Sequence, residues 1–313
     1  MSTPHQIAHR IDVHHHPSPP SYLTLRGERD GAHGPQQSWT VEKSIEDMDR
    51  NGVATSVLSL PHAAAHIFSG GNAEARRVVR EWNEFMAVLA RDHPGRFGVF
   101  AALPILDIEG SLAEIAYAFD TLKAHGVCLM TNIGDRWLGD PHYEPVFEEL
   151  NRRRAVVYTH PVASNCCRGI LPEFMDALIE YGTDTTRAIA KLLVTGCLTR
   201  YPDIRFIFSH AGGTLPYLAW RFVKARELKD LPGGFVAAVN RLYYDCAQTA
   251  SPYAMASFTK LISTSQLLFG TDFPYRSADL HVEGLSDCGF TKEELHAIDC
   301  GNALRLMPQL QRS

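Results

Sequence analysis

The stretch Ile11-Asp12-Val13-His14-His15-His16 joins an apolar strand to a run of histidines. Side chains alternate between the two faces of a strand, so His14 and His16 are expected to point the same way. Two neutral imidazoles on one face can bind a single transition-metal ion. On a surface strand the same pair would simply be solvated. The metal interpretation therefore depends on finding further ligands elsewhere in the chain.

Short β-branched or aromatic runs alternate with longer helical patterns from this first strand to the end of the chain. Eight strands are expected, at residues 7–13, 54–60, 97–103, 127–132, 155–159, 204–209, 242–246 and 266–270. Helices are expected at residues 41–51, 74–92, 110–124, 143–153, 186–200, 214–229, 252–263 and 292–306. Eight βαβ-type units predict an α/β fold, closed into a (β/α)8 TIM-type barrel. A doubly wound open sheet is the alternative, but no Gly-X-Gly-X-X-Gly follows the first strand.

The whole chain, residues 1–313, is expected to form one barrel domain, since such barrels often reach about 250 residues or more. Two connections are unusually long. Residues 17–40 follow the first strand, and residues 161–184 follow the fifth. Loops after barrel strands form the catalytic face, so both are predicted to be lids or walls over a site. The alternative for each is a disordered surface insertion.

Composition excludes several classes of protein. A hydrophobic content of 45% and a charged content of 21% are ordinary for a globular protein with a large core. The net charge of −5 gives no basic field for nucleic acid or anionic lipid. No apolar run approaches the ~20 residues that span a membrane. Seven scattered cysteines without Cys-X-X-Cys indicate neither a disulfide framework nor a zinc ribbon, so the cytoplasm is the expected location.

Polar residues that could bind a metal follow three more of the expected strands. His160 ends the fifth strand, His210 ends the sixth and Asp272 ends the eighth. The carboxyl ends of barrel strands converge on one mouth. Three imidazoles and one carboxylate suit Zn²⁺, with a position left open for water or substrate. Each residue alone could be a hydrogen-bonded loop residue or a helix cap, but their occurrence at the ends of four strands makes chance a poor explanation.

Four motifs, in order along the chain, resemble the amidohydrolase superfamily. They are Asp12-Val13-His14-His15-His16, Thr159-His160-Pro161, Ser209-His210-Ala211-Gly212-Gly213 and Gly270-Thr271-Asp272-Phe273-Pro274. The most similar branch is that of 2-amino-3-carboxymuconate-6-semialdehyde decarboxylase and the salicylate-type decarboxylases, over nearly the whole chain. Residues 138–140, 182–187 and 215–217 further resemble the 6-methylsalicylate decarboxylases.

The resemblance implies that His14, His16, His160 and Asp272 bind one divalent metal ion. His210 would then be a base or proton relay beside the metal. Some relatives carry Glu in place of His14 and favour Mn²⁺, so the histidine here favours Zn²⁺, with Mn²⁺ as the alternative. Binuclear members use a carboxylated lysine at the end of strand four, where this chain has Met130-Thr131-Asn132, so one ion is expected. The resemblance also implies a homodimer or homotetramer.

Arg221 is a candidate for binding a substrate carboxylate. It lies eleven residues after His210, the spacing at which related decarboxylases place a carboxylate-binding arginine. A guanidinium matches a carboxylate bidentately. The alternative is an arginine on the exposed face of a helix, with Arg168, Arg187 and Arg276 as further candidates. Cys166 and Cys167 are expected to line the pocket or to be buried, not to act as nucleophiles.

Together these features predict a metal-dependent, non-oxidative decarboxylase, a carbon–carbon lyase acting on a small hydroxy-aromatic or enolic carboxylic acid. Asp272, with His210 behind it or through a water molecule, would deliver the proton. An alternative is a hydrolase of an amide or lactone, in which the same metal activates water and His210 is the base. A third possibility is a non-catalytic metal-binding barrel, but such a protein would have no need for the complete set of ligands.

Overall fold

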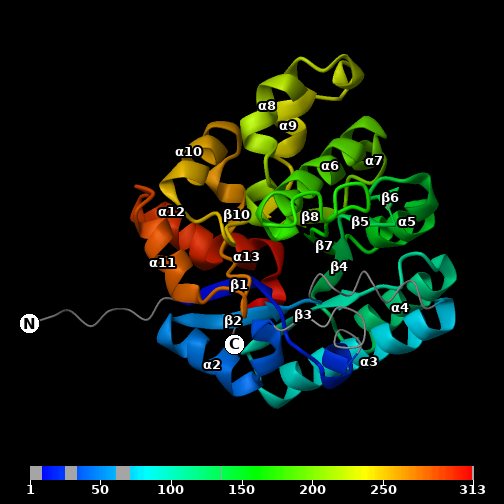
Figure 1. Cartoon of the computed structure of the whole chain (residues 1–313), viewed down its shortest axis with the longest axis vertical. Helices are drawn as coiled ribbons and strands as arrows, with labels where there is room; N and C mark the ends of the chain where they lie inside the picture. The colour runs from blue at the N-terminus through cyan, green and yellow to red at the C-terminus, as the bar shows by residue number, and fades with distance from the viewer. Residues whose placement is uncertain (1–8, 25–33, 61–70, 135, 312–313) are drawn as a thin grey trace, which may run out of the picture.

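The computed structural model describes residues 9–24, 34–60, 71–134 and 136–311. Eight parallel strands form one sheet in the order β1-β2-β3-β4-β7-β8-β9-β10 (Figure 1). They are β1 (Arg10–His15), β2 (Val53–Leu58), β3 (Phe97–Ala102), β4 (Gly126–Met130), β7 (Val156–His160), β8 (Arg205–Phe208), β9 (Tyr243–Asp245) and β10 (Leu267–Leu268). All eight overlap the strands expected from the sequence.

The sheet closes on itself between its first and last strands. The Val13 amide donates to the Phe269 carbonyl at 3.0 Å, and the His16 amide donates to the Phe273 carbonyl at 2.8 Å. In return the Asp272 amide donates to the His14 carbonyl, also at 2.8 Å. The predicted (β/α)8 barrel is therefore confirmed. Closure also brings Asp272 beside the histidine run.

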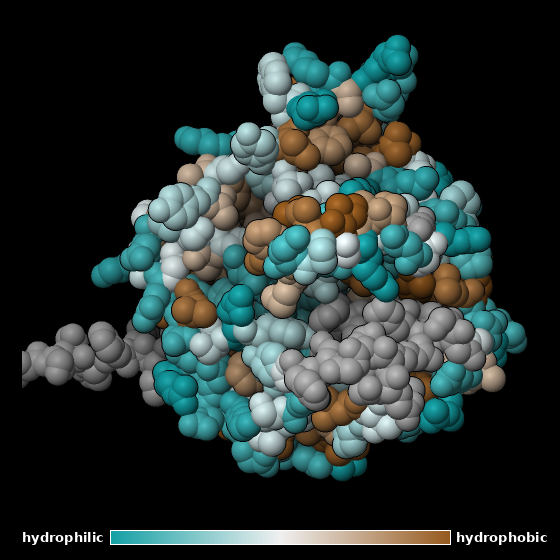
Figure 2. Space-filling model, in the orientation of Figure 1, coloured by the Kyte–Doolittle hydropathy of each residue, from teal (hydrophilic) through white to brown (hydrophobic). Residues whose placement is uncertain are grey.

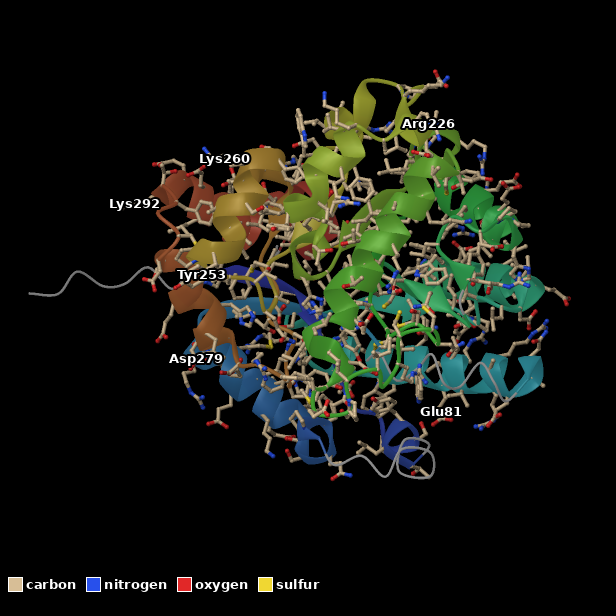
Figure 3. The ribbon with its side chains drawn as sticks, turned by 45° about the horizontal axis from the view of Figure 1, so that its top comes forward. Glu81, Arg226, Tyr253, Lys260, Asp279 and Lys292 are labelled. Atoms are coloured by element: carbon tan, nitrogen blue, oxygen red, sulfur yellow. The ribbon has the colours of Figure 1, made fainter. Side chains whose placement is uncertain are left out.

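Helices surround the barrel as an outer layer (Figure 1). They include α2 (Val41–Arg50), α3 (Asn72–Asp92), α4 (Ile108–Asp120), α5 (Glu144–Arg152), α6 (Glu180–Val194), α7 (Cys197–Arg200), α8 (Leu215–Val223), α9 (Gly234–Val239), α10 (Pro252–Leu261), α11 (Ala278–Ser286), α12 (Lys292–His296) and α13 (Asn302–Leu306). Large apolar side chains such as Trp82, Phe147 and Phe258 face inward and are fully buried. Charged side chains such as Glu81 and Lys260 point away from the barrel (Figure 3). In the described parts of the chain, no helix combines the length and apolar character needed to cross a membrane.

Local sequence signals explain several helix starts. Thr40 caps α2 by accepting a hydrogen bond from the Lys43 amide, and Ser251 caps α10, whose first residue is Pro252. Thr291 and Glu294 form a capping box at the start of α12. The predicted helix over 292–306 includes a π-helical turn, Ala297–Gly301, between α12 and α13.

Several boundaries differ from those expected. Strand β1 continues to His15, because the His14 carbonyl accepts from the Asp272 amide and His15 pairs with Leu58 of β2. Residues 7 and 8 lie outside the described residues. The predicted helix over 186–200 is two helices, because Gly196 is left-handed (φ 69°) between α6 and α7. The predicted helix over 214–229 ends at Val223. Helices α9 and α11 and the hairpin of β5 (Asn132–Ile133) and β6 (Arg136–Trp137) were not predicted.

The two long connections are only partly as expected. Helix α6 begins at Glu180, so the connection after β7 spans residues 161–179 rather than 161–184. Of the predicted connection 17–40, residues 25–33 lie outside the described part of the chain. One described end is held to α3, since Trp82 Nε1 donates to Ser21 Oγ at 2.9 Å, and the two described ends are linked to each other, since the Tyr22 hydroxyl donates to Gln36 Oε1 at 3.0 Å.

Candidate metal centre

The structure gathers four of the residues singled out in the sequence at the carboxyl end of the barrel. His14 lies in β1 and His16 directly follows it, His160 ends β7, and Asp272 follows β10. One potential ligand atom from each lies within 4.8 Å of the others, and all four residues are buried. His14 Nε2 and His16 Nε2 are 3.0 Å apart, and Asp272 Oδ1 lies 3.2 Å from each. The arrangement could hold one metal ion.

Hydrogen bonds at the Nδ1 atoms orient the three imidazole rings so that their Nε2 atoms point at the space between the four residues. His14 Nδ1 lies 2.9 Å from Asp245 Oδ2, and a carboxylate only accepts, so Nδ1 carries the proton. His160 Nδ1 donates to the Pro161 carbonyl at 2.9 Å. His16 Nδ1 lies 3.3 Å from the Ser59 carbonyl. Such outer partners fix the tautomer and the orientation of metal-binding histidines.

Asp245 is a site residue that the sequence analysis did not single out. It ends β9 and is fully buried. Besides facing His14, it accepts hydrogen bonds from the Tyr158 hydroxyl at 3.3 Å and from the His210 amide at 2.9 Å. Its position at the end of the seventh barrel strand is the same signal that marked His160, His210 and Asp272. Asp245 therefore ties β1, β7 and the turn after β8 to one carboxylate.

The charges of the cluster are strongly coupled. Burial acts to lower the pKa of His14, but the carboxylates of Asp245 and Asp272 raise that pKa to about 10. Burial also opposes ionisation of Asp272, yet the neighbouring His14 holds the pKa of the carboxyl well below its usual range. Burial lowers the pKa of His16 and, together with neighbouring imidazoles, holds the pKa of His160 well below its usual value. Burial thus disfavours the charged forms of His16 and His160, whereas the two carboxylates favour the charged form of His14.

This donor set fits a divalent cation. Three Nε2 atoms and one carboxylate oxygen converge, and such atoms repel one another unless a positive charge lies between them. The raised pKa of His14 shows that the cluster attracts positive charge. Metals bind neutral imidazoles and ionised carboxylates, so a cation at this point would take the place of the proton that the two carboxylates favour on His14. The residues present therefore suit a bound divalent metal ion.

His210 lies beside the cluster rather than within it. Its Nε2 is 3.6 Å from Asp272 Oδ2, the oxygen that also accepts a hydrogen bond from the Gln248 side chain. His210, Gln248 and Asp272 all have left-handed backbones, with φ of 54°, 54° and 65°. Such angles are uncommon for residues other than glycine. Gln248, like Asp245, was not identified from the sequence; it follows β9 and holds the carboxylate that His210 faces.

The candidate arginines do not join this cluster within one chain. Arg221 is exposed on α8, and no hydrogen bond or ion pair links it to the described cluster residues. Arg187, on α6, contacts Cys167 Sγ at 3.5 Å. Arg168 and Arg276 are exposed and donate to the carbonyls of Ala163 and Tyr275.

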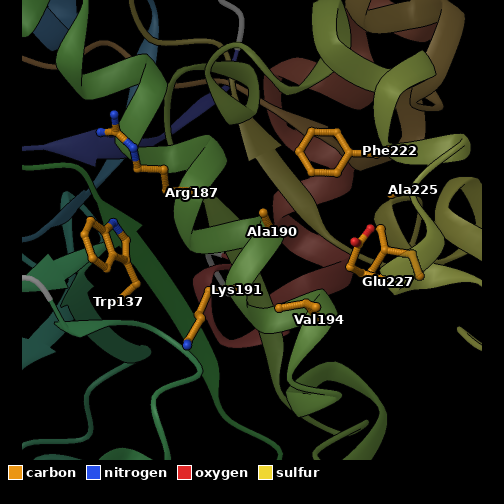
Figure 4. A pocket seen from close by; sticks show the side chains of 9 residues that line it. Trp137, Arg187, Ala190, Lys191, Val194, Phe222, Ala225 and Glu227 are labelled. Carbon is orange, nitrogen blue, oxygen red and sulfur yellow. The ribbon is translucent and has the colours of Figure 1, made fainter.

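Cys166 is exposed and Cys167 is half-buried in the connection after β7, so neither is fully buried. A separate cavity of about 450 Å³ lies over α6 and α8 (Figure 4). Trp137 and Phe222 face it from opposite sides, with Arg187 and Lys191 at one edge. None of the four cluster residues lines this cavity.

Comparison with known proteins agrees with the resemblance seen in the motifs. A family model described as amidohydrolase matches residues 11–308. "Decarboxylase yanB" of Aspergillus niger is 35% identical, over 96% of this chain and 88% of that protein. "6-methylsalicylic acid decarboxylase" of Penicillium expansum is 33% identical, over 96% of this chain and 97% of that protein. A solved dihydroxybenzoic acid decarboxylase of Polaromonas, with bound manganese and 2-nitroresorcinol, shares the fold (TM-score 0.83, 21% identity, 97% of this chain and 98% of that one). The chain belongs to the amidohydrolase family.

Proposed function

We propose that this protein is a metal-dependent, non-oxidative decarboxylase of a small hydroxy-aromatic, salicylate-like or enolic carboxylic acid. The convergence of His14, His16, His160 and Asp272, with His210 beside them, carries the proposal. Relatives that are 33–35% identical over nearly the whole chain are named as decarboxylases. The chain acts as a single barrel domain in the cytoplasm.

One divalent ion would be held by His14, His16, His160 and Asp272 in this proposal. Three imidazoles with one carboxylate favour Zn²⁺. The manganese in the Polaromonas enzyme makes Mn²⁺ the alternative. When bound, the ion would offset the charge of the substrate's carboxylate and orient it together with a neighbouring hydroxyl.

The residues around the cluster supply the proton that decarboxylation needs. A proton passes from His210, by way of Asp272 or a water molecule, to the ring carbon that bears the carboxylate, and a ring electron pair forms the new C–H bond. The C–C bond then breaks, its electron pair restores the aromatic ring, and CO₂ leaves. The net change replaces CO₂ by a proton. An ortho hydroxyl feeds electrons into the ring, which is why salicylate-like acids fit better than plain benzoate.

A CO₂-release screen tests this function. Purified protein, loaded in parallel with Zn²⁺ or Mn²⁺, is incubated with ortho-hydroxybenzoates, plain benzoate, and a panel of amides and lactones. We expect CO₂ from ortho-hydroxybenzoates and none from benzoate. Acid release from an amide or lactone without CO₂ would replace the proposal by the hydrolase alternative. No turnover of any compound with either metal would favour a non-catalytic barrel.

A homodimer or homotetramer is part of the same proposal, and a second copy of the chain is the partner that we assign to α8. Tyr217 and Trp220 on this helix are 86% and 69% exposed. Apolar residues also gather at the surface over α8 and α9 (Figure 2). Contiguous exposed apolar surface of this kind marks interaction sites. Arg221 follows Trp220 and would bind the substrate carboxylate from across the subunit interface.

Arg221→Lys tests this assignment. Lysine keeps the charge but loses the planar pair of donors, so we expect a higher KM for every accepted acid. Arg226→Lys, on the neighbouring 3-10 turn η6 (Arg226–Leu228), is the matched control and should behave as wild type. Mixing inactive Arg221→Ala with inactive His160→Ala should partly restore CO₂ release, because a mixed oligomer contains one intact site. If both Arg221 variants turn over every acid as wild type does, Arg221 is only a surface residue.

A further inference from the structure

We propose that Asp184, on α6, is a positioning residue that holds the candidate metal ligand His160 in place. Asp184 is fully buried at the outer side of the strand ends. It was not among the candidate site residues from the sequence. The inference rests on the proposed function only in taking the cluster to bind a divalent metal ion.

Asp184 gathers the segment that follows β4. Its carboxylate accepts hydrogen bonds from Asn132 Nδ2 at 2.7 Å and from Trp137 Nε1 at 2.7 Å. The Thr131 hydroxyl also donates to it. The three donors belong to the end of the fourth barrel strand and the β5–β6 hairpin. The Asp184 carboxylate on α6 therefore holds the segment after β4 in place beside β7.

The same segment holds the backbone on both sides of Pro161. The Thr131 amide donates to the His160 carbonyl at 3.0 Å. The Asn132 side chain, which donates one hydrogen to Asp184, donates another to the Val162 carbonyl at 3.1 Å. Between these two anchored carbonyls lies that of Pro161, which accepts from His160 Nδ1 and so sets the ring. The path from Asp184 to the His160 ring therefore runs through the hydrogen bonds of Asn132, the backbone between Val162 and Pro161, and the hydrogen bond of His160 Nδ1.

Burying this carboxylate is unfavourable for folding alone. Burial raises the pKa of Asp184 above its usual range, and the hydrogen bonds from Thr131, Asn132 and Trp137 act against that rise. The nearest cationic group, Arg187 Nη1, is 3.8 Å from Asp184 Oδ1. The negative charge of Asp184 is therefore stabilised mainly by hydrogen bonds from neutral donors. A buried ionised group is retained at a cost unless its partners are well placed. A role in fixing His160 accounts for a carboxylate at this position.

Asn132→Ala and Trp137→Phe separate positioning from mere stability. Each substitution removes one hydrogen-bond donor to Asp184, but only the Asn132 side chain also donates to the Val162 carbonyl. We expect Asn132→Ala and Asp184→Asn to weaken zinc binding about tenfold, the lower end of the effect of outer partners on metal affinity. Trp137→Phe should bind zinc as wild type does. Zinc affinity is measured by competition with a chromogenic chelator, and the absorption spectrum of the cobalt-loaded protein reports ligand geometry.

Asp299→Asn is the matched control, because Asp299 is a half-buried carboxylate paired with Arg10 at the opposite end of β1. It should lower thermal stability without changing zinc affinity. The role of Asp184 is overturned if Asp184→Asn and Asn132→Ala lower stability but leave zinc affinity and the cobalt spectrum as in wild type. It is also overturned if Trp137→Phe weakens zinc binding as much as Asn132→Ala. A wild-type protein that binds no divalent ion would contradict the proposed function as well.

Discussion

His160→Ala is expected to abolish both the bound metal and the release of CO₂. The substitution removes one of four converging ligands and leaves a small cavity at a fully enclosed position. The remaining set, two imidazoles and one carboxylate, would bind a divalent ion far more weakly. Elemental analysis of the purified variant, beside the CO₂ assay, measures both effects. Wild type should contain one ion per chain.

His142→Ala is the control for this substitution. His142 is half-buried and contacts the Leu106 carbonyl at 3.1 Å, outside the cluster, so its loss should leave metal content unchanged. A His160→Ala protein with full metal content would remove His160 from the ligand set. Two ions per chain in wild type would instead overturn the mononuclear proposal, which rests on Met130-Thr131-Asn132 at the end of strand four.

His210→Asn is expected to keep the metal and to lose most of the catalytic rate. A group that transfers protons typically contributes about 10²–10⁴-fold to the rate. Asparagine is chosen because it tolerates the left-handed backbone at His210 (φ 54°) better than alanine does. The measurements are kcat for an accepted acid and metal content of the same preparation.

The backbone control for His210→Asn is Lys123→Asn, since Lys123 is also left-handed (φ 58°) but lies after α4, away from the cluster. Its activity should equal that of wild type. If His210→Asn loses its metal along with its activity, His210 is a ligand and not a proton relay. If it retains wild-type kcat, the proton comes from elsewhere.

The barrel could be predicted from sequence because its strands are buried on both faces. Parallel barrel strands therefore form continuous apolar runs, such as Phe206-Ile207-Phe208, and the polar residue at the end of each run stands out. His14, His16, His160 and Asp272 were found in this way. The eight strands could also be counted, because each run is bounded by helical patterns of clearly different period.

Features that depend on tertiary contacts could not be predicted. Residues 180–184 contain Gly182, Thr183 and Asp184, all weak helix formers, so they were assigned to a loop. In the structure Asp184 is anchored to Asn132 of β5 and the helix starts at Glu180. Asp245 was missed because the expected strand ran to residue 246 and placed Asp245 inside the strand rather than at its end. Gln248 was missed because an amide in a loop carries no spacing signal.

The left-handed backbones at His210, Gln248 and Asp272 have a consequence for engineering this enzyme. A side chain held in such a conformation costs about 1–3 kcal/mol of stability, whereas glycine adopts it readily. A screen that selects only for thermostability would therefore be drawn to glycine at these three positions. It would recover a more heat-resistant barrel that has lost its chemistry. Stabilisation of this protein should be directed to the helical outer layer, with these three positions excluded from the library.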